Sequence, residues 1–287
     1  MSRVVVITDS VSCIPREMVN QYGIKVVPAA TFSFNGTTYV DWVDISPSDA
    51  LEMLQQWPEG FSTSAIPPTT FSDIFREIGR DAENVLCLTL SGKLSAVSDM
   101  ARLAGKEIED ENGNIMIRVF DTNTCASAEG LVVLAAARAA QEGKGLDEIE
   151  DVARRAAERT HFIGVFGTTK YLHRSGRIPK MAANMGSTLG IKPVFRIEDG
   201  SVRLYSVVRN KKRGIDRCLK DMDEKVRGRP IHVAVAHAGV PEEAEELKSR
   251  ILSQFNCVEA YTTEFSPVMA YSIGPGLAAI GYQIVDK

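Results

Sequence analysis

The sequence predicts a two-domain α/β protein, and three observations lead to that prediction. At 287 residues the chain exceeds the usual size of a single domain. Its first half alternates short apolar runs with helical patterns, which indicates a mainly parallel sheet with helices on both faces. After about His161 the pattern changes to shorter β-like pieces separated by turns, which predicts an α+β domain with a mixed or antiparallel sheet. We therefore expect domains at residues 1–162 and 163–287.

Continuous apolar runs are the predicted strands of the first domain, because strands covered on both faces need not alternate with polar residues. The runs lie at 4–7, 85–90 and 115–120. Helix-start and helix-stop signals between and after them predict four helices. These begin at Pro15, at a cap on Ser95, near Glu129 and at Asp147, where Glu150 three residues later suggests a capping box.

The second domain is marked by turn signals. Asp199-Gly200 stands between two β-prone runs, at 194–197 and 202–208, and this dipeptide is a strong hairpin signal. A helix is predicted from Pro241 to Phe255, and a glycine-rich turn follows at 274–276. The order of the strands in this half does not follow from the sequence.

Composition places the chain among soluble, fully folded proteins. Hydrophobic residues make up 44% and charged residues 24%, and the net charge of −4 disfavours nucleic-acid binding. Asp9 interrupts the first apolar run far short of a signal peptide or membrane span, so we expect a cytoplasmic protein. The five cysteines include no Cys-x-x-Cys pair, which supports neither a disulfide framework nor a zinc site.

Positive charge is concentrated between residues 164 and 213, where eleven Lys and Arg accompany only Glu198 and Asp199. One interpretation is a solvated face balanced by the acidic helices around 148–158 and 242–246. The other is a docking face for an acidic partner or a phosphate-bearing ligand, with Lys211, Lys212 and Arg213 as its centre.

Hydroxyl-bearing residues gather where the predicted parallel strands end and the chain turns into helices. They are Thr8, Ser10 and Ser12; Ser62, Thr63 and Ser64; Ser91 and Ser95; and Thr122 and Thr124. Ligands of open parallel sheets bind at this edge, and hydroxyls beside helix N-termini favour an anion. A carboxylate or a phosphate would satisfy this pattern, although a single serine or threonine at a helix start is usually only a cap.

Catalytic machinery is not apparent. The four histidines lack metal-ligand spacing, and there is neither a Gly-x-Ser-x-Gly elbow nor a phosphate-binding loop of the Gly-x-x-x-x-Gly-Lys type. Ser95 as a nucleophile would need a base that the sequence does not identify. We therefore expect a binding protein and not an enzyme, with a hydrolase or a small-molecule phosphotransferase using the hydroxyl-rich loops as the alternative.

An ordered set of short motifs resembles the DegV family. The motifs are Thr8-Asp9-Ser10, Thr63-Ser64 with prolines at 67 and 68, Ser91-Gly92-Lys93-Leu94-Ser95, Tyr171-Leu172, Gly176-Arg177-Ile178, Gly190-Ile191-Lys192-Pro193 and Gly274-Pro275-Gly276. They run in family order from residue 8 to residue 276, and the total length matches. No single motif is decisive, but the ordered set is specific.

The resemblance implies a two-domain α/β protein that holds one long-chain fatty acid, such as palmitate, stearate or oleate, in a buried tunnel. It implies that Thr63 and Ser95 bond the carboxylate near the domain junction, with Ser64, Arg177, Ser272 and Gly274 completing the site, and that no metal or cofactor is needed. It also implies presentation of the carboxylate to the catalytic subunit of a fatty acid kinase. Candidates for the tunnel lining are Met100, Met181, Met185 and Met269.

Two positions depart from the family pattern. Ser95 is followed by Ala96-Val97 where Gly-Thr is usual, and Ser272 stands where a histidine commonly precedes the glycine-rich turn. Lipid binding can tolerate both changes, but the loss of the histidine weakens the implied link to a kinase. A third interpretation is a regulatory or scaffold protein that docks a partner through the basic stretch, with lipid as a structural filler.

Overall fold

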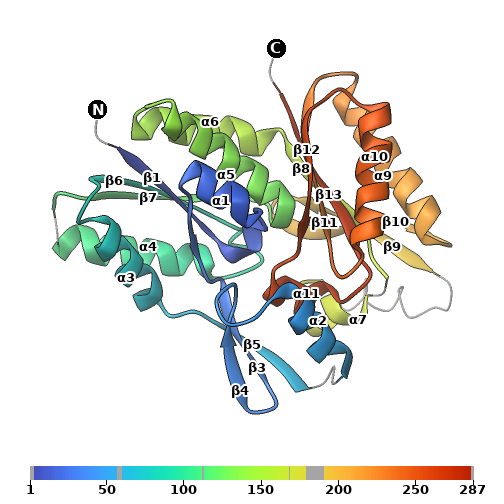
Figure 1. Ribbon diagram of the computed structural model, residues 1–287, viewed down its shortest axis with the longest axis horizontal. Coiled ribbons are helices and arrows are strands. Elements are labelled where there is room, and N and C mark those ends of the chain that lie inside the picture. Colours follow the sequence, from blue (N-terminus) through green and yellow to red (C-terminus); the bar gives the residue numbers. More distant parts are fainter. Residues whose placement is uncertain (1–2, 57–59, 112, 168, 179–190, 286–287) are drawn as a thin grey trace.

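The computed structural model describes residues 3–56, 60–111, 113–167, 169–178 and 191–285. Within these ranges the chain forms two large sheets and one small sheet, with helices packed against them (Figure 1). The strands of one large sheet are all parallel and those of the other are mixed, which confirms the predicted α/β fold class.

The first large sheet has the order β2-β1-β6-β7, and every neighbouring pair is parallel. Its strands are β1 (Val4–Asp9), β2 (Lys25–Val27), β6 (Asn84–Thr89) and β7 (Met116–Asp121). The two central strands, β1 and β6, are almost wholly buried, as their continuous valine, isoleucine and leucine content predicts. Because all four strands run the same way, the loops that follow them open at one edge.

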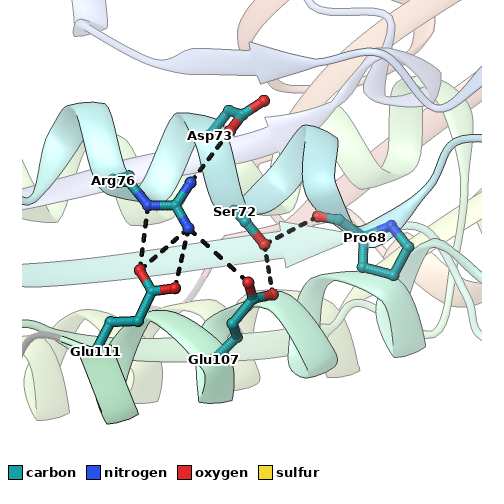
Figure 2. A network of polar contacts seen from close by, with 6 residues as sticks. All are labelled: Pro68, Ser72, Asp73, Arg76, Glu107 and Glu111. Atoms are coloured by element: carbon teal, nitrogen blue, oxygen red, sulfur yellow. Dashed lines mark hydrogen bonds and ion pairs between the residues drawn. The ribbon is translucent and has the colours of Figure 1, made fainter.

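Helices cover both faces of this sheet. On one face lie α3 (Pro68–Ile78) and α4 (Val97–Glu111), and on the other lie α1 (Arg16–Tyr22), α5 (Ala126–Gln141) and α6 (Leu146–Glu158). Figure 2 shows the polar network that joins α3 to α4, in which Arg76 contacts Glu107 and Glu111 of α4. These ion pairs are half-exposed and contribute little energy, so the helices are held mainly by the buried apolar contacts between them.

A small antiparallel sheet projects beyond the edge of the first sheet, and the sequence did not lead us to expect it. It has the order β4-β3-β5, from β3 (Ala30–Phe34), β4 (Thr37–Val40) and β5 (Phe61–Ala65). The connection between β3 and β4 is Asn35-Gly36, and both residues have positive φ, as a tight hairpin requires. Helix α2 (Pro47–Gln56) packs beside it.

The second large sheet is mixed, with the order β10-β9-β8-β13-β11-β12. Its strands are β8 (Thr160–Val165), β9 (Lys192–Glu198), β10 (Ser201–Val208), β11 (Ile231–His237), β12 (Cys257–Glu264) and β13 (Ala278–Ile284). All pairs are antiparallel except β11 with β12. The predicted hairpin at Asp199-Gly200 is confirmed, with φ of 47° and 71° at its two residues.

The two faces of the second sheet have different coverings. Helices α9 (Lys211–Val226) and α10 (Pro241–Gln254) pack on one face, over alternate residues such as Ile163 and Val165. On the other face lies α5, which also packs on β1 of the first sheet. The contact is close: a Cβ at Gly281 of β13 would lie 2.6 Å from the backbone nitrogen of Ala128. Helix α5 is thus shared by both large sheets.

Two short helices complete the junction on this side, α7 (Lys170–Arg174) and α11 (Pro267–Ile273), and they pack against each other. None of the described helices is long and apolar enough to cross a membrane. The predicted domain boundary at residue 162 falls inside β8, the first strand of the second sheet, and the division into domains stays a prediction.

Two predicted helix starts are wrong by one or two residues. Helix α4 begins at Val97, and the Ala96 carbonyl accepts its first intrahelical bond, so Ser95 stands one residue before the cap position. Helix α6 begins at Leu146 after Gly145, whose backbone N–H donates to the Glu148 carboxylate over 2.9 Å. The capping interaction therefore involves Gly145 and Glu148 and not Asp147 and Glu150.

Candidate functional site

A cavity of about 420 Å³ opens where the small sheet, the two large sheets, α7 and α11 meet. This volume is within the range of small-molecule sites, about 300–1,000 Å³. Its described walls are mainly apolar. They comprise Val11, Ala29, Ala30, Ala65, Leu90, Leu94, Ala96, Cys125, Phe162, Phe166, Leu172, Phe195, Ile197, Val202, Val268, Met269 and Ile273. Six polar residues complete the lining: Thr63, Ser64, Ser95, Arg177, Arg196 and Ser272.

The base of the cavity is aromatic and buried. Phe162 comes from β8, Phe166 follows that strand, and Phe195 comes from β9, and each is at most 5% exposed. The rings of Phe166 and Phe195 meet edge to face with centroids 5.1 Å apart. Cys125, at the start of α5, also lines the cavity, and burial raises the pKa of its thiol, which keeps it uncharged. Such a surface suits an alkyl group.

The polar lining residues other than Arg196, which lies beside Phe195 on β9, form what we call the rim. Thr63 and Ser64 lie on β5, Ser95 lies just before α4, and Ser272 lies on α11. Arg177 follows α7, and it and Ser64 are exposed, whereas the other three are partly buried. The structure thus brings five of the six predicted site residues to one cavity, although they come from segments up to 209 residues apart, from 63 to 272.

Gly274, the sixth predicted residue, is not part of the described lining. It ends α11 with φ of 75°, and a Cβ there would lie 2.1 Å from Cδ2 of Tyr171. Glycine is therefore required here for a steric reason, because the absence of a side chain lets α11 approach α7. Contact between Gly274 and a ligand stays a prediction.

The hydroxyls at the rim differ in their availability. The Ser272 hydroxyl donates to the Val268 carbonyl over 3.2 Å, within its own helix. By contrast, no side chain or backbone group among the described residues bonds the hydroxyls of Thr63 or Ser95. These two donors are free to face a ligand.

Positive potential is built into the rim from two directions. The Arg177 guanidinium is held by a bond from its Nε to the carbonyl of Leu94, over 3.3 Å, and both residues line the cavity. Helix α4 begins beside Ser95, and the first-turn N–H groups of a helix lack intrahelical partners and lie at the positive end of its dipole. The rim therefore favours an anionic head group.

The motif Thr8-Asp9-Ser10 lies behind the cavity wall and does not line it. The Asp9 carboxylate accepts bonds from the backbone N–H of Val11, over 3.0 Å, and of Leu90, over 2.9 Å, and both of those residues line the cavity. Burial raises the pKa of Asp9 to about 7 and that of the neighbouring Glu129 well above its usual range. Asp9 thus fixes the backbone of two wall residues.

Groups for catalysis are scarce around Ser95. The described residues that line the cavity include no histidine, aspartate, glutamate or lysine, so this set offers Ser95 no general base. Within the described ranges no group of three or more potential ligands could hold a metal ion.

Sequence reasoning missed the aromatic base, because Phe162, Phe166 and Phe195 read as ordinary strand residues. Of the four methionine candidates, Met269 lines the cavity, Met100 is partly buried and packs against the core, and Met181 and Met185 lie outside the described residues.

Part of the basic stretch is neutralised within the chain. Lys211 pairs with Glu243 of α10, and Arg196 pairs with Asp221 over 3.3 Å and with Glu198. The pairing of Lys211 with the acidic helix at 242–246 agrees with the interpretation that this part of the basic stretch is a solvated face balanced by acidic residues. Lys212 and Arg213 are exposed on the first turn of α9.

Comparison with known proteins identifies the family of this chain. The sequence profile described as "Uncharacterised protein, DegV family" matches residues 3–285, nearly the whole chain. The chain belongs to the DegV family. A DegV domain-containing protein of Clostridium perfringens is 30% identical over 278 residues, which cover 96% of this chain and 97% of that protein.

Solved structures of the DegV family have the same fold. The structure of a DegV family protein from Thermus thermophilus, described as fatty acid binding, has a TM-score of 0.90 and 28% identity. The match covers 99% of this chain and 100% of that one. DegV of Bacillus subtilis, described as a fatty acid binding protein, has a TM-score of 0.89 at 24% identity, with 99% and 100% covered. At the latter identity the likeness establishes the fold alone.

Proposed function

We propose that this DegV family member binds one long-chain fatty acid, such as palmitate, stearate or oleate, in the cavity at the domain junction. The hydroxyls of Thr63 and Ser95 bond the carboxylate. Ser64, Arg177 and Ser272 surround it, and the alkyl chain lies against the aromatic base. The observation that carries the proposal is that one cavity combines buried aromatic residues with more exposed hydroxyls and Arg177.

The energetics of an amphiphile agree with this division. Burying an alkyl chain gives about 0.8 kcal/mol per methylene, so the tail supplies most of the affinity. The polar residues therefore serve mainly to orient the head group. Each hydrogen bond to a charged carboxylate contributes about 1.5–3 kcal/mol. The Thermus thermophilus relative described as fatty acid binding supports the choice of ligand.

We further propose that the bound carboxylate is presented to the ATP-using subunit of a fatty acid kinase, so that this chain is the non-catalytic partner. The exposure of Ser64 and Arg177 at the rim supports access of another protein to the head group. Ser272 stands where a histidine is common in the family, and its hydroxyl donates to the Val268 carbonyl, so the donors available to the head group are Thr63 and Ser95.

The first experiment is mass spectrometry of the purified protein, under native conditions and again after solvent extraction. We expect one fatty acid per chain. Protein that is empty, and that binds neither added palmitate nor added oleate, would contradict the proposal and return attention to a phosphorylated ligand at the hydroxyl-rich loops.

The head-group assignment is tested with two isosteric variants and two ligands of equal length. Thr63→Val and Ser95→Ala should each weaken palmitate binding about tenfold, because each removes a donor to a charged oxygen. Binding of 1-hexadecanol, which has no carboxylate, should change much less. Equal losses for both ligands would place the head group elsewhere.

Presentation to a kinase is tested by adding ATP and hydroxylamine to extracts of the source organism, with and without the palmitate-loaded protein. Formation of palmitoyl hydroxamate that depends on this chain is the expected result. No increase, from a protein shown to carry palmitate, would leave a binding protein without the kinase role.

A further inference from the structure

The segment after β4 directs one buried carboxylate toward α11, across the domain junction. Asp41 is fully buried, and one of its oxygens accepts a bond from the backbone N–H of Val268 over 3.0 Å. Val268 lies in the first turn of α11, where backbone donors have no partner within the helix. The cap residue of this helix, Ser266, makes no capping bond with its side chain, so Asp41 takes that role from a distant part of the chain.

The second oxygen of Asp41 connects to the N-terminal wall of the same cavity. It accepts a bond from the Ser10 hydroxyl, and that hydroxyl accepts a bond from the backbone N–H of Ala29 over 2.9 Å. Ala29 lines the cavity, as does Val11 beside Ser10. A single carboxylate therefore connects wall segments near residues 10, 29 and 268.

The backbone next to Asp41 is strained in a way that supports this assignment. Trp42 has φ of 70°, a conformation that a bulky aromatic residue rarely adopts and that persists only where the surroundings enforce it. Arg16 contacts this residue: its guanidinium lies 4.4 Å from the centre of the Trp42 ring and donates to the Trp42 carbonyl over 2.8 Å. This turn is what directs Asp41 inward.

We propose that Asp41 is a positioning residue of the cavity, whose carboxylate holds α11, and with it Val268, Met269, Ser272 and Ile273, against the N-terminal wall. The proposal builds on the fatty-acid-binding function above. Loss of the carboxylate should let α11 move away and let a bound lipid leave sooner, while the rim hydroxyls of Thr63 and Ser95 stay intact.

The test uses the full chain, palmitate as the ligand, and two measurements. In Asp41→Ala the dissociation rate of palmitate should rise about tenfold, a change of about 1.4 kcal/mol, with a smaller change in association rate. Amide hydrogen exchange across residues 267–273 should become faster in the lipid-free protein. Asp41→Asn keeps an acceptor for the Val268 N–H and should restore both measurements nearly to those of the wild type.

Asp44→Ala is the matched control, because Asp44 bonds the Val40 N–H in the same turn over 2.7 Å but is exposed to solvent. If Asp41→Ala and Asp44→Ala give the same exchange in α11 and the same dissociation rate, the proposal is wrong. If Asp41→Ala does not fold, Ser10→Ala and Arg16→Ala decide instead: both should speed exchange in α11, and unchanged exchange in both would overturn the proposal. The exchange measurement needs no lipid, so it stays informative if the wild type binds no palmitate.

Discussion

The base and the rim of the cavity are built by different means. The base comes from regular strands, where Phe162 and Phe195 occupy sheet positions that burial of apolar surface alone would select. The rim comes from strand ends, loops and two short helices, held together by polar contacts such as Arg177 to Leu94 and Asp41 to Val268. We therefore expect substitutions at the base to lower the stability of the fold, and substitutions at the rim to weaken ligand binding.

The largest expected effect is at the base. Phe195→Ala should lower the free energy of unfolding by about 3–5 kcal/mol, because it removes a fully buried ring and leaves a cavity. Urea denaturation measures this change. Ser64→Ala at the exposed rim is the comparison and should stay within about 0.5 kcal/mol of the wild type. Similar losses for the two variants would remove the distinction between base and rim.

The next effect is the pH dependence of stability that arises from Asp41, the carboxylate that bonds α11. Burial raises the pKa of Asp41 from 3.8 to about 6, so the folded protein binds this proton more tightly than the unfolded chain. The resulting stabilisation is present below pH 4 and is lost as the pH rises through 6, by up to about 3 kcal/mol for a shift of this size. Asp41→Asn cannot ionise.

We therefore expect Asp41→Asn to gain stability relative to the wild type as the pH rises from about 4 to about 7, with little further change above that. The neighbouring acids Asp9 and Glu129 titrate in both proteins, so their contribution largely cancels in the difference. Denaturation curves at several pH values measure it. A difference that does not change with pH would mean that Asp41 titrates as it does in the unfolded chain.

A smaller effect is expected where α11 ends against α7. Gly274→Ala combines a positive φ with a Cβ that would overlap the Tyr171 ring, and should cost about 2–3 kcal/mol of stability. Gly276→Ala is the comparison, since it also has a positive φ, of 81°, but no atom within 4 Å of the added Cβ. It should cost only about 1–2 kcal/mol. Thermal unfolding measures both variants, and equal costs would show that neither the Tyr171 ring nor the ψ of 174° at Gly274, which is essentially limited to glycine, adds to the cost.

The smallest effect is expected from the exposed charge at the rim. Arg177→Gln should weaken palmitate binding by about twofold to fivefold at low salt, because solvent screens an exposed cation. The loss should shrink further at 0.5 M salt, when measured by competition with a fluorescent fatty acid. A loss that salt does not change would point to a direct, desolvated contact instead.

Sequence reasoning succeeded where local chemistry decides the structure. Asp199-Gly200 specified its hairpin because few other dipeptides accept two successive positive φ angles, and unbroken apolar runs specified the parallel strands. The small sheet was missed because β3, β4 and β5 are short and rich in threonine and serine, and therefore resemble loops.

For the site, the resemblance to a family pointed to Thr63, Ser64, Ser95, Arg177 and Ser272, which the structure gathers at one rim. It did not point to Asp41, which in the sequence is one acid in an apparent turn. Its partner Val268 is 227 positions away, and no local pattern encodes such a pairing. Gly274 was selected for the ligand, whereas its close approach to Tyr171 became visible only once α7 and α11 were placed.

Helix α5 has a consequence for any attempt to divide the protein. Because it packs on strands of both large sheets and admits no side chain at Gly281, a fragment ending near residue 162 would leave one side of this helix in water. A fragment beginning there would uncover the matching surface of β13. We expect neither half to be soluble when expressed alone, and co-expressed halves to recover the native form only by reassembling around α5. We therefore expect the two halves to unfold together as one cooperative unit.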